Sequence, residues 1–85
     1  MFIIEFSKRA KKFLLKCSKN LQKRIIDKIA LLQEEPVPHK SVKVVGEEKT
    51  FRVRVGSYRI LYQIKWSKKT IIIAKIDKRD KVYSR

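Results

Sequence analysis

The sequence predicts a single α+β domain in which a mostly antiparallel sheet carries an N-terminal pair of helices on one face. Two observations lead to this prediction. Apolar residues recur with a helical period from Ser7 to residue 35, and with a period of two from Val42 onwards. The expected order of elements is therefore β-α-α-β-β-β-β. A chain of 85 residues has the length of one domain, so we assign residues 1–85 to a single unit.

The first third of the chain is expected to form one strand and two helices. Phe2 to Phe6 is short, apolar and rich in β-forming residues, as is typical of a strand. Ser7 is of a type that caps helices, and apolar and basic side chains beyond it fall on opposite helical faces. A second, longer helix is capped by Ser18 or Asn20. It ends at Glu34-Glu35, because a proline follows.

Beyond the helices, alternating hydrophobic residues predict four strands joined by turns. In order, these are a short strand from Val42 that stops at Gly46, a strand Thr50 to Val55, a turn Gly56-Ser57, a strand Tyr58 to Lys65, a turn Trp66 to Lys69 and a strand Thr70 to Ile76. A two-residue turn that contains glycine suits a β-hairpin, because glycine adopts positive φ without steric cost. The last strand is almost continuously apolar, which favours a central place in the sheet.

Charge is the unusual feature of the composition. The chain has 23 Lys and Arg against 8 Asp and Glu, a net charge of +15. Such an excess favours a polyanion or an acidic protein as partner. One cysteine and one histidine supply neither a disulfide nor a zinc site, so we expect no metal and no cofactor. The longest apolar run, Ile71 to Ala74, is far below the roughly 20 residues of a membrane span, and the N-terminus lacks the order of a signal peptide. We therefore expect a cytoplasmic protein without membrane contact.

Three arginines are expected to gather on the face of the sheet that no helix covers. Because side chains alternate along a strand, Arg52 and Arg54 project away from the core when Val53 points into it. The hairpin brings Arg59 beside them. Like charges opposite one another destabilise a sheet. The cluster is explained either by a bound phosphate, which suits planar guanidinium groups, or by solvated strand charges that oppose aggregation. We favour phosphate, because these are arginines on adjacent inner strands.

A basic tail follows the last strand and contains Lys78, Arg79, Lys81 and Tyr83. A short return of the chain would bring Arg79 and Tyr83 over the face that carries the arginines. A tyrosine near a terminus is more often a hydrophobic anchor with a hydrated hydroxyl group. The tail therefore remains a candidate extension of the arginine cluster.

The hairpin and the tail resemble those of the RelE/ParE toxin superfamily. Its signature is a glycine, a short gap and an arginine-rich hairpin, which correspond here to Val45-Gly46 and to residues 51–62, FRVRVGSYRILY. The order of elements also matches. The ending at residues 78–83, KRDKVY, resembles the basic tail of the RelE branch. ParE-like members share the scaffold and poison DNA gyrase, so the hairpin identifies the superfamily more sharply than the activity.

The resemblance to the RelE branch implies a toxin of a type II toxin–antitoxin system that cleaves mRNA in the ribosomal A site without a metal ion. The catalytic positions that it implies are Arg52, Arg54, Arg59, Arg79 and Tyr83, and Lys78 and Lys81 are expected as further contacts to RNA. The implied chemistry is attack of a ribose 2′-hydroxyl on the adjacent phosphate, which leaves a 2′,3′-cyclic phosphate and a 5′-hydroxyl. Such a reaction needs a base, an acid and positive charge near phosphorus.

This sequence departs from many RelE relatives, which carry lysine where it has Arg52 and Arg54. Arginine does not lose its proton in a protein, so both residues remain as electrostatic contacts. The role of base then falls to Tyr83, whose pKa neighbouring guanidinium groups would lower. Relatives often place a basic residue where Val45 stands, so that contact is missing here. A slower enzyme that relies on the ribosome to orient the RNA fits these substitutions.

A toxin of this kind implies three partners: the ribosome, mRNA and an acidic antitoxin of the RelB type that covers the arginines. Two alternatives remain open. The first is a ParE-like toxin that acts on gyrase, against which the retained Arg79 and Tyr83 argue. The second is an RNA- or ribosome-binding module that shares the charge but lacks catalysis.

Overall fold

A five-stranded mixed sheet with two helices forms the structure, a computed structural model that describes residues 1–38, 41–44 and 50–78. The strands are β1 (Ile3–Phe6), β2 (Val42–Lys43), β3 (Thr50–Val55), β4 (Tyr58–Lys65) and β5 (Thr70–Lys78), and the α-helices are α1 (Lys8–Lys16) and α2 (Lys19–Glu34). A short 3-10 helix, η1 (Trp66–Lys68), forms the expected turn between β4 and β5. The strand order is β1-β5-β4-β3-β2, with β1 parallel to β5 and the other pairs antiparallel. The predicted α+β fold and element order are confirmed, and β5 is an inner strand, as its apolar run indicated.

Both helices begin at a serine, which fixes where the chain leaves β1 and where it turns between the helices. The Ser7 hydroxyl oxygen accepts a hydrogen bond from the Ala10 N–H, and the Ser18 hydroxyl accepts one from the Leu21 N–H. Ser18 is thus the cap of α2. The Ser7 hydroxyl also donates to the Ala74 carbonyl oxygen at 2.7 Å, which ties the start of α1 to β5.

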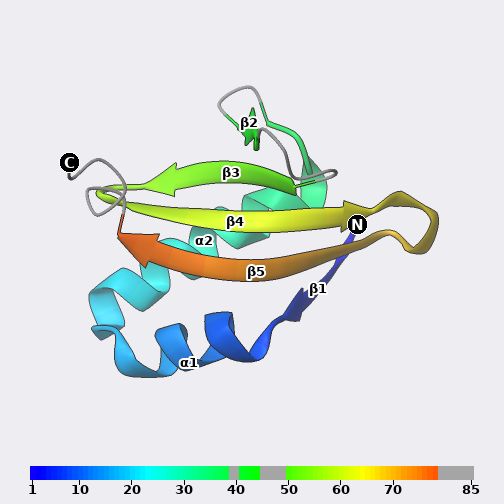
Figure 1. Ribbon diagram of the computed structural model, residues 1–85. Coiled ribbons are helices and arrows are strands. Elements are labelled where there is room, and N and C mark those ends of the chain that lie inside the picture. The colour runs from blue at the N-terminus through cyan, green and yellow to red at the C-terminus, as the bar shows by residue number, and fades with distance from the viewer. Residues whose placement is uncertain (39–40, 45–49, 79–85) are drawn as a thin grey trace.

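The core lies between the two helices and one face of the sheet, and Figure 1 shows α2 crossing behind the strands. Its buried hydrophobic residues are Ala10, Leu14, Ile25, Ile29, Leu32, Val53, Val55, Ile60, Tyr62, Ile64, Ile71, Ile73 and Ile76. Tyr62 is fully buried, its ring stacks on Phe51, and its hydroxyl donates to the Pro36 carbonyl oxygen at 2.7 Å. Burial raises the pKa of this phenol, against a smaller lowering by a hydrogen bond with Ser41. Tyr62 is therefore a structural residue that holds the segment after α2 onto the sheet.

An irregularity in the pairing of β4 with β5 shifts the phase of β5. Leu61 pairs with Lys75, whereas the next residue, Tyr62, pairs with Ile73. Ala74 is the extra residue on β5, and the irregularity is a β-bulge. A bulge of this kind reverses which side chains face the core beyond it.

The bulge at Ala74 brings charged side chains onto the face away from the helices. Ile73 before the bulge and Ile76 after it are both buried, so the buried positions change from odd to even residue numbers. Lys75 and Asp77 consequently project from the opposite face. Uninterrupted alternation would have placed both charges in the core, at a high cost in free energy.

The hairpin between β3 and β4 depends on glycine. Gly56 has a φ of 60°, and a Cβ atom there would lie 2.5 Å from a guanidinium nitrogen of Arg24. Gly56→Ala is expected to lower the free energy of unfolding by about 1 kcal/mol, because alanine is strained in the left-handed region. Urea denaturation measures the change, and Ser57→Ala in the same turn is the control. Equal stability of the two variants would contradict this explanation.

No helix in the described part of the chain is long and apolar enough to cross a membrane.

Candidate functional site

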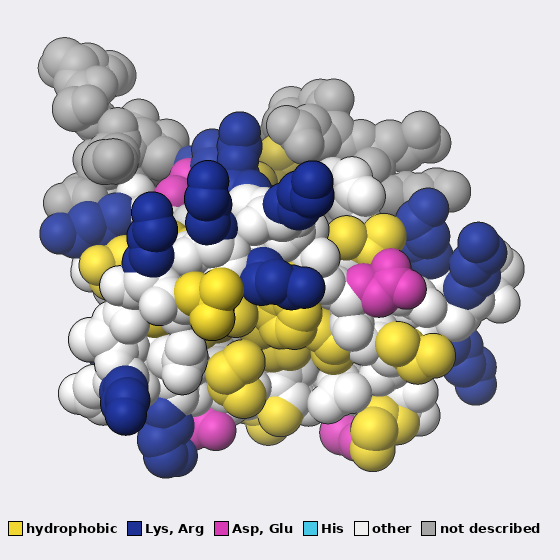
Figure 2. Space-filling view, turned by 90° about the horizontal axis from the view of Figure 1, so that it is seen from below, with side chains coloured by type: hydrophobic (Ala, Val, Ile, Leu, Met, Phe, Trp, Pro, Cys, Tyr) yellow, Lys and Arg dark blue, Asp and Glu magenta, His cyan; other side chains and the backbone are white. Residues whose placement is uncertain are grey.

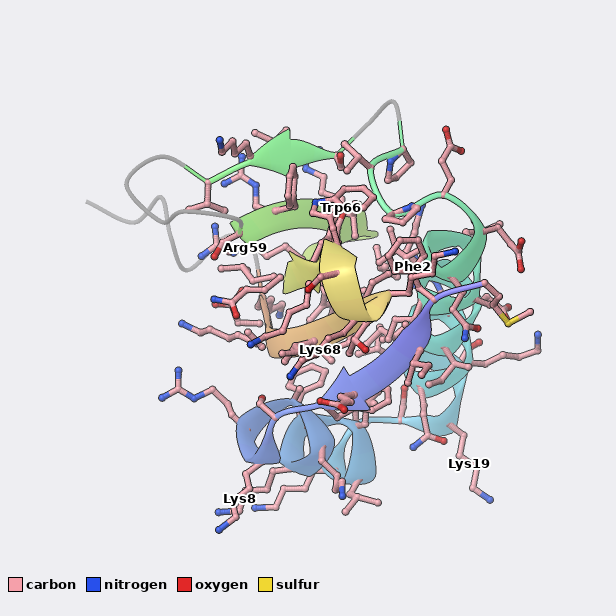
Figure 3. The ribbon with its side chains drawn as sticks, turned by 90° about the vertical axis from the view of Figure 1, so that its right-hand side faces the viewer. Phe2, Lys8, Lys19, Arg59, Trp66 and Lys68 are labelled. Atoms are coloured by element: carbon pink, nitrogen blue, oxygen red, sulfur yellow. The ribbon has the colours of Figure 1, made fainter. Side chains whose placement is uncertain are left out.

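Arg52, Arg54 and Arg59 lie on the face of the sheet opposite the helices. Arg54 and Arg59 are directly paired across β3 and β4, and Arg52 stands two residues along β3. The residues between them on β3 and after them, Val53 and Val55, are buried in the core. Figure 3 shows Arg59 on the side of the sheet away from α2. The alternation expected from the sequence thus brings three guanidinium groups onto two neighbouring strands.

Asp77 joins this cluster from the adjacent strand, where it is the register partner of Arg59. The Arg59 Nε donates to Asp77 Oδ1 at 2.8 Å, and Lys75 Nζ lies 3.4 Å from Asp77 Oδ2. Burial works to raise the pKa of Asp77. The hydrogen bonds and positive charges of Arg59 and Lys75 outweigh burial and hold that pKa below its ordinary value. The carboxylate is therefore ionised at neutral pH and linked to two cations.

Because the pKa of Asp77 is lowered in the folded state, the free energy of unfolding depends on pH. The ionised carboxylate stabilises the folded state above the pKa of the unfolded chain, and this contribution is lost as the pH falls through the lower folded pKa. We expect Asp77→Asn to lose about 1 kcal/mol of unfolding free energy at pH 7 and less at pH 2. Thermal unfolding across this range measures it, with Asp27→Asn, from the exposed Lys23–Asp27 pair, as control. A loss independent of pH would contradict the prediction.

Arg52 and Arg54 also border a hollow of about 580 Å³ at the edge of β3. Within the described ranges, its other lining residues are Lys28, Glu35, Pro38, Val42 and Val53. The hollow lies beside β2, which pairs with β3 at Phe51 and Arg52. Its volume is in the range of small-molecule sites. Cations from β3 and α2 thus meet at the edge of the sheet, next to the face that carries Arg59.

Lys78 is not brought beside the arginines. It pairs with Tyr58, whose ring contacts Phe13 of α1, so its side chain leaves the sheet on the helix side. It is exposed at the end of β5. The other tail residues expected at the site, Arg79, Lys81 and Tyr83, lie outside the described residues, as does Val45.

Lys75 and Asp77 are the site residues that the sequence prediction missed. The last strand was interpreted as a continuous apolar strand that ended at Ile76, and Asp77 was assigned to the tail. A signal was present: Lys75 is in phase with Ile71 and Ile73, and a lysine in phase with core residues implies a break in alternation.

Positive charge extends well beyond the arginine cluster. Lys8, Lys11, Lys12 and Lys16 of α1 are all exposed. Figure 2 shows Lys and Arg side chains at many places around a patch of hydrophobic ones, on the side that is lowest in Figure 1. Within the described ranges, no three His, Cys, Asp or Glu residues gather where they could hold a metal ion. A long polyanion would therefore meet favourable charge on more than one side of the molecule.

A small α+β domain with a helix pair, a mixed sheet and an arginine-bearing hairpin is the architecture of a family of bacterial and archaeal toxins. Residues 4–83 match the family described as ParE toxin of the type II toxin–antitoxin system parDE. A protein of Methanocaldococcus jannaschii named toxin RelE1 is 31% identical over an alignment of 85 positions, and the match covers 96% of this chain and 94% of the relative. The chain belongs to the RelE/ParE superfamily of type II toxins.

Solved structures support the same membership. The archaeal RelE–RelB complex from Pyrococcus horikoshii contains a chain that is 29% identical, with a TM-score of 0.80 over 92% of this chain and 94% of that one. The toxin in the intact Escherichia coli RelBE complex gives a TM-score of 0.83 at 21% identity, over 92% of this chain and 96% of that one. The second likeness concerns the fold alone.

Proposed function

We propose that this toxin is a ribosome-dependent endoribonuclease that cleaves mRNA in the A site. The observation that carries the proposal is the juxtaposition of Arg52, Arg54 and Arg59 on the face away from the helices. The 31% identity to a protein named as a RelE toxin supports the RelE type of activity over the gyrase-poisoning type.

Guanidinium groups supply the positive charge that the proposed reaction needs. As the 2′-hydroxyl attacks the adjacent phosphate, negative charge builds on the phosphorus oxygens, and fixed cations stabilise it most at that moment. Arg54 is exposed on β3 and Arg59 stands opposite it, so a phosphate held between them would separate two like charges. In this mechanism the cations of the protein replace a metal ion. Arginine keeps its proton, so these residues bind and stabilise rather than transfer protons.

Proton transfer is assigned to the tail on the strength of the family resemblance. Tyr83 is the proposed base that takes the proton of the 2′-hydroxyl. As the bond from phosphorus to the 5′-oxygen breaks, that oxygen takes a proton from water. Arg79 is a further proposed contact to the phosphate. Lys81 is proposed to bind RNA beside them, and Lys78, on the helix side of β5, would contact RNA outside the reacting phosphate. Positioning of the mRNA by the ribosome is proposed to supply the remaining rate enhancement, because fixing the reacting atoms in line removes much of the entropic barrier.

The test is cleavage of a defined mRNA on purified ribosomes, read by primer extension and by the chemistry of the new ends. We expect cleavage only with ribosomes present, and products with a 2′,3′-cyclic phosphate and a 5′-hydroxyl. The match to the ParE family makes gyrase the second target to assay. Inhibited supercoiling without any cleavage would replace this proposal by the gyrase type, and RNA binding without cleavage would indicate a non-catalytic module.

An acidic antitoxin of the RelB type is the proposed partner in the cell, where both proteins would act in the cytoplasm. The Pyrococcus relative was solved as a RelE–RelB complex. With a net charge of +15, this chain should attract an acidic partner over a long range. We expect the association rate to fall at least about tenfold between 50 mM and 500 mM salt, because electrostatic steering is screened. Stopped-flow mixing measures it, and a rate independent of salt would exclude steering.

A further inference from the structure

We propose that Asp77 is a positioning residue that fixes the guanidinium group of Arg59 in the orientation in which it grips the RNA phosphate. The consequence for cleavage rests on the proposed nuclease function. The orientation of Arg59 itself does not depend on that function.

The hydrogen bond between the two side chains uses the inner nitrogen of the guanidinium group. Arg59 Nε donates to Asp77 Oδ1 at 2.8 Å. A guanidinium group carries further N–H donors on its two terminal nitrogens, in the same plane. Binding at Nε therefore fixes that plane and leaves donor capacity for a phosphate, which suits a two-pronged grip.

Asp77 is itself held in place, so it is a rigid support. Its second oxygen, Oδ2, lies 3.4 Å from Lys75 Nζ, and its backbone follows the bulge that turns this stretch of β5 toward Arg59. The Arg59 and Asp77 side chains are only 13% and 21% exposed, against 75% and 65% for Lys23 and Asp27. A pair so withdrawn from solvent is less screened and less mobile than an exposed one.

A carboxylate beside a proposed phosphate site is unfavourable for binding unless other interactions offset its negative charge. It repels the phosphate, but Lys75 offsets its charge and the surrounding arginines keep the cluster positive. The Asp77 carboxylate also offsets the repulsion between neighbouring arginines on the sheet. Arg59 faces Arg54 across β4 and β3, and without Asp77 the repulsion between them would drive the two guanidinium groups apart. Holding Arg59 in a fixed orientation toward the phosphate therefore lowers the barrier by more than the negative charge of Asp77 raises it.

The first experiment compares single-turnover cleavage on programmed ribosomes by the wild type, Asp77→Ala and Asp77→Asn. Removal of the acceptor in Asp77→Ala should lower the rate about 10- to 100-fold, by analogy with the loss when a residue that orients a metal ligand is removed. Asp77→Asn keeps an oxygen for Nε and should retain most of the rate. The concentration of ribosomes at half-maximal rate should change little. Asp27→Ala removes an acid from an exposed ion pair and should leave the rate unchanged.

A double-mutant cycle separates positioning from an independent role. Arg59→Lys keeps the positive charge but has no Nε donor. In that background, Asp77→Ala should cause little further loss, because the two changes remove the same arrangement. Losses that multiply would show that Asp77 acts on its own, and a wild-type rate for Asp77→Ala would overturn the proposal outright. Thermal unfolding of each variant identifies any loss caused by misfolding, in which case the NMR comparison of Asp77→Asn with the wild type, described next, replaces the alanine variant.

The second experiment does not require cleavage. In the wild type, the Arg59 Nε–H signal in NMR spectra should exchange slowly with solvent and shift when inorganic phosphate is added. In Asp77→Asn the exchange should be faster than in the wild type, and in Asp77→Ala it should be faster still. Asp77→Ala should also need at least about tenfold more phosphate for the same shift. If the wild type cleaves no RNA, the nuclease proposal fails and this measurement alone decides whether Asp77 orients Arg59. Equal exchange and equal phosphate response in all three proteins would exclude it.

Discussion

Arg59→Ala is expected to lower the single-turnover rate of mRNA cleavage on the ribosome by about 10²- to 10³-fold, the loss typical of removing one donor that stabilises a charged transition state. Arg59 is the central cation of the cluster. It pairs with Arg54 across one strand boundary and with Asp77 across the other, and its side chain is held by a 2.8 Å hydrogen bond. A fixed donor needs no reorganisation when charge develops, so its loss should affect the rate more than binding.

The matched control for this variant is Arg9→Ala on the exposed surface of α1. It removes the same charge and side chain from a position away from the arginine cluster, and it should retain a rate within about threefold of the wild type. If Arg59→Ala and Arg9→Ala lowered the rate equally, the effect would belong to general electrostatic attraction to the ribosome, and the site proposed here would be wrong.

Tyr62→Ala is expected to lower the free energy of unfolding by about 3 to 5 kcal/mol, because it leaves a large cavity under the sheet. Domains of this size have little stability to lose, so the variant should be largely unfolded at 37 °C. Tyr62 is fully buried, stacks on Phe51 and donates to the Pro36 carbonyl oxygen. Calorimetry and chemical denaturation measure the loss.

Tyr62→Phe separates the structural role of this tyrosine from any role in cleavage. It keeps the ring and removes only the hydroxyl, so the loss should be about 1 to 2 kcal/mol, from the carbonyl oxygen that remains without its donor. Cleavage at 25 °C should be close to that of the wild type, because the hydroxyl points into the core toward Pro36. A large loss of cleavage with stability intact would show that a tyrosine inside the hairpin takes part in the reaction.

The hairpin that carries the arginines was predictable because local rules decide its geometry. A two-residue turn with glycine fixes the register, and alternation then determines the face of every side chain on both strands. Arg52, Arg54 and Arg59 follow from these rules, and the structure pairs Arg54 with Arg59. The Ser7 cap was predictable for the same reason, since a cap depends on residues within one helical turn, and the second cap was narrowed to Ser18 or Asn20.

The contribution of β5 to the site was predictable only in part. Lys75, in phase with core residues, indicates a break in alternation, but the position of the break depends on pairing between strands. The bulge at Ala74 arises where β5 meets β4, and alternation within β5 alone gives no sign of which residue is extra. Lys75 and Asp77 reach the arginines only because of it. The roles of Arg79 and Tyr83 stay predictions from the family resemblance.

The place of β5 in the sheet has a consequence for when the newly made chain can fold. This strand lies between β1 and β4, so the first strand of the chain has no neighbour to pair with until residues 70–78 have been synthesised. The chain therefore cannot complete its core until this strand has left the ribosome. Until then the arginines of β3 and β4 also lack Lys75 and Asp77, which β5 contributes, so the complete cluster forms only late in folding.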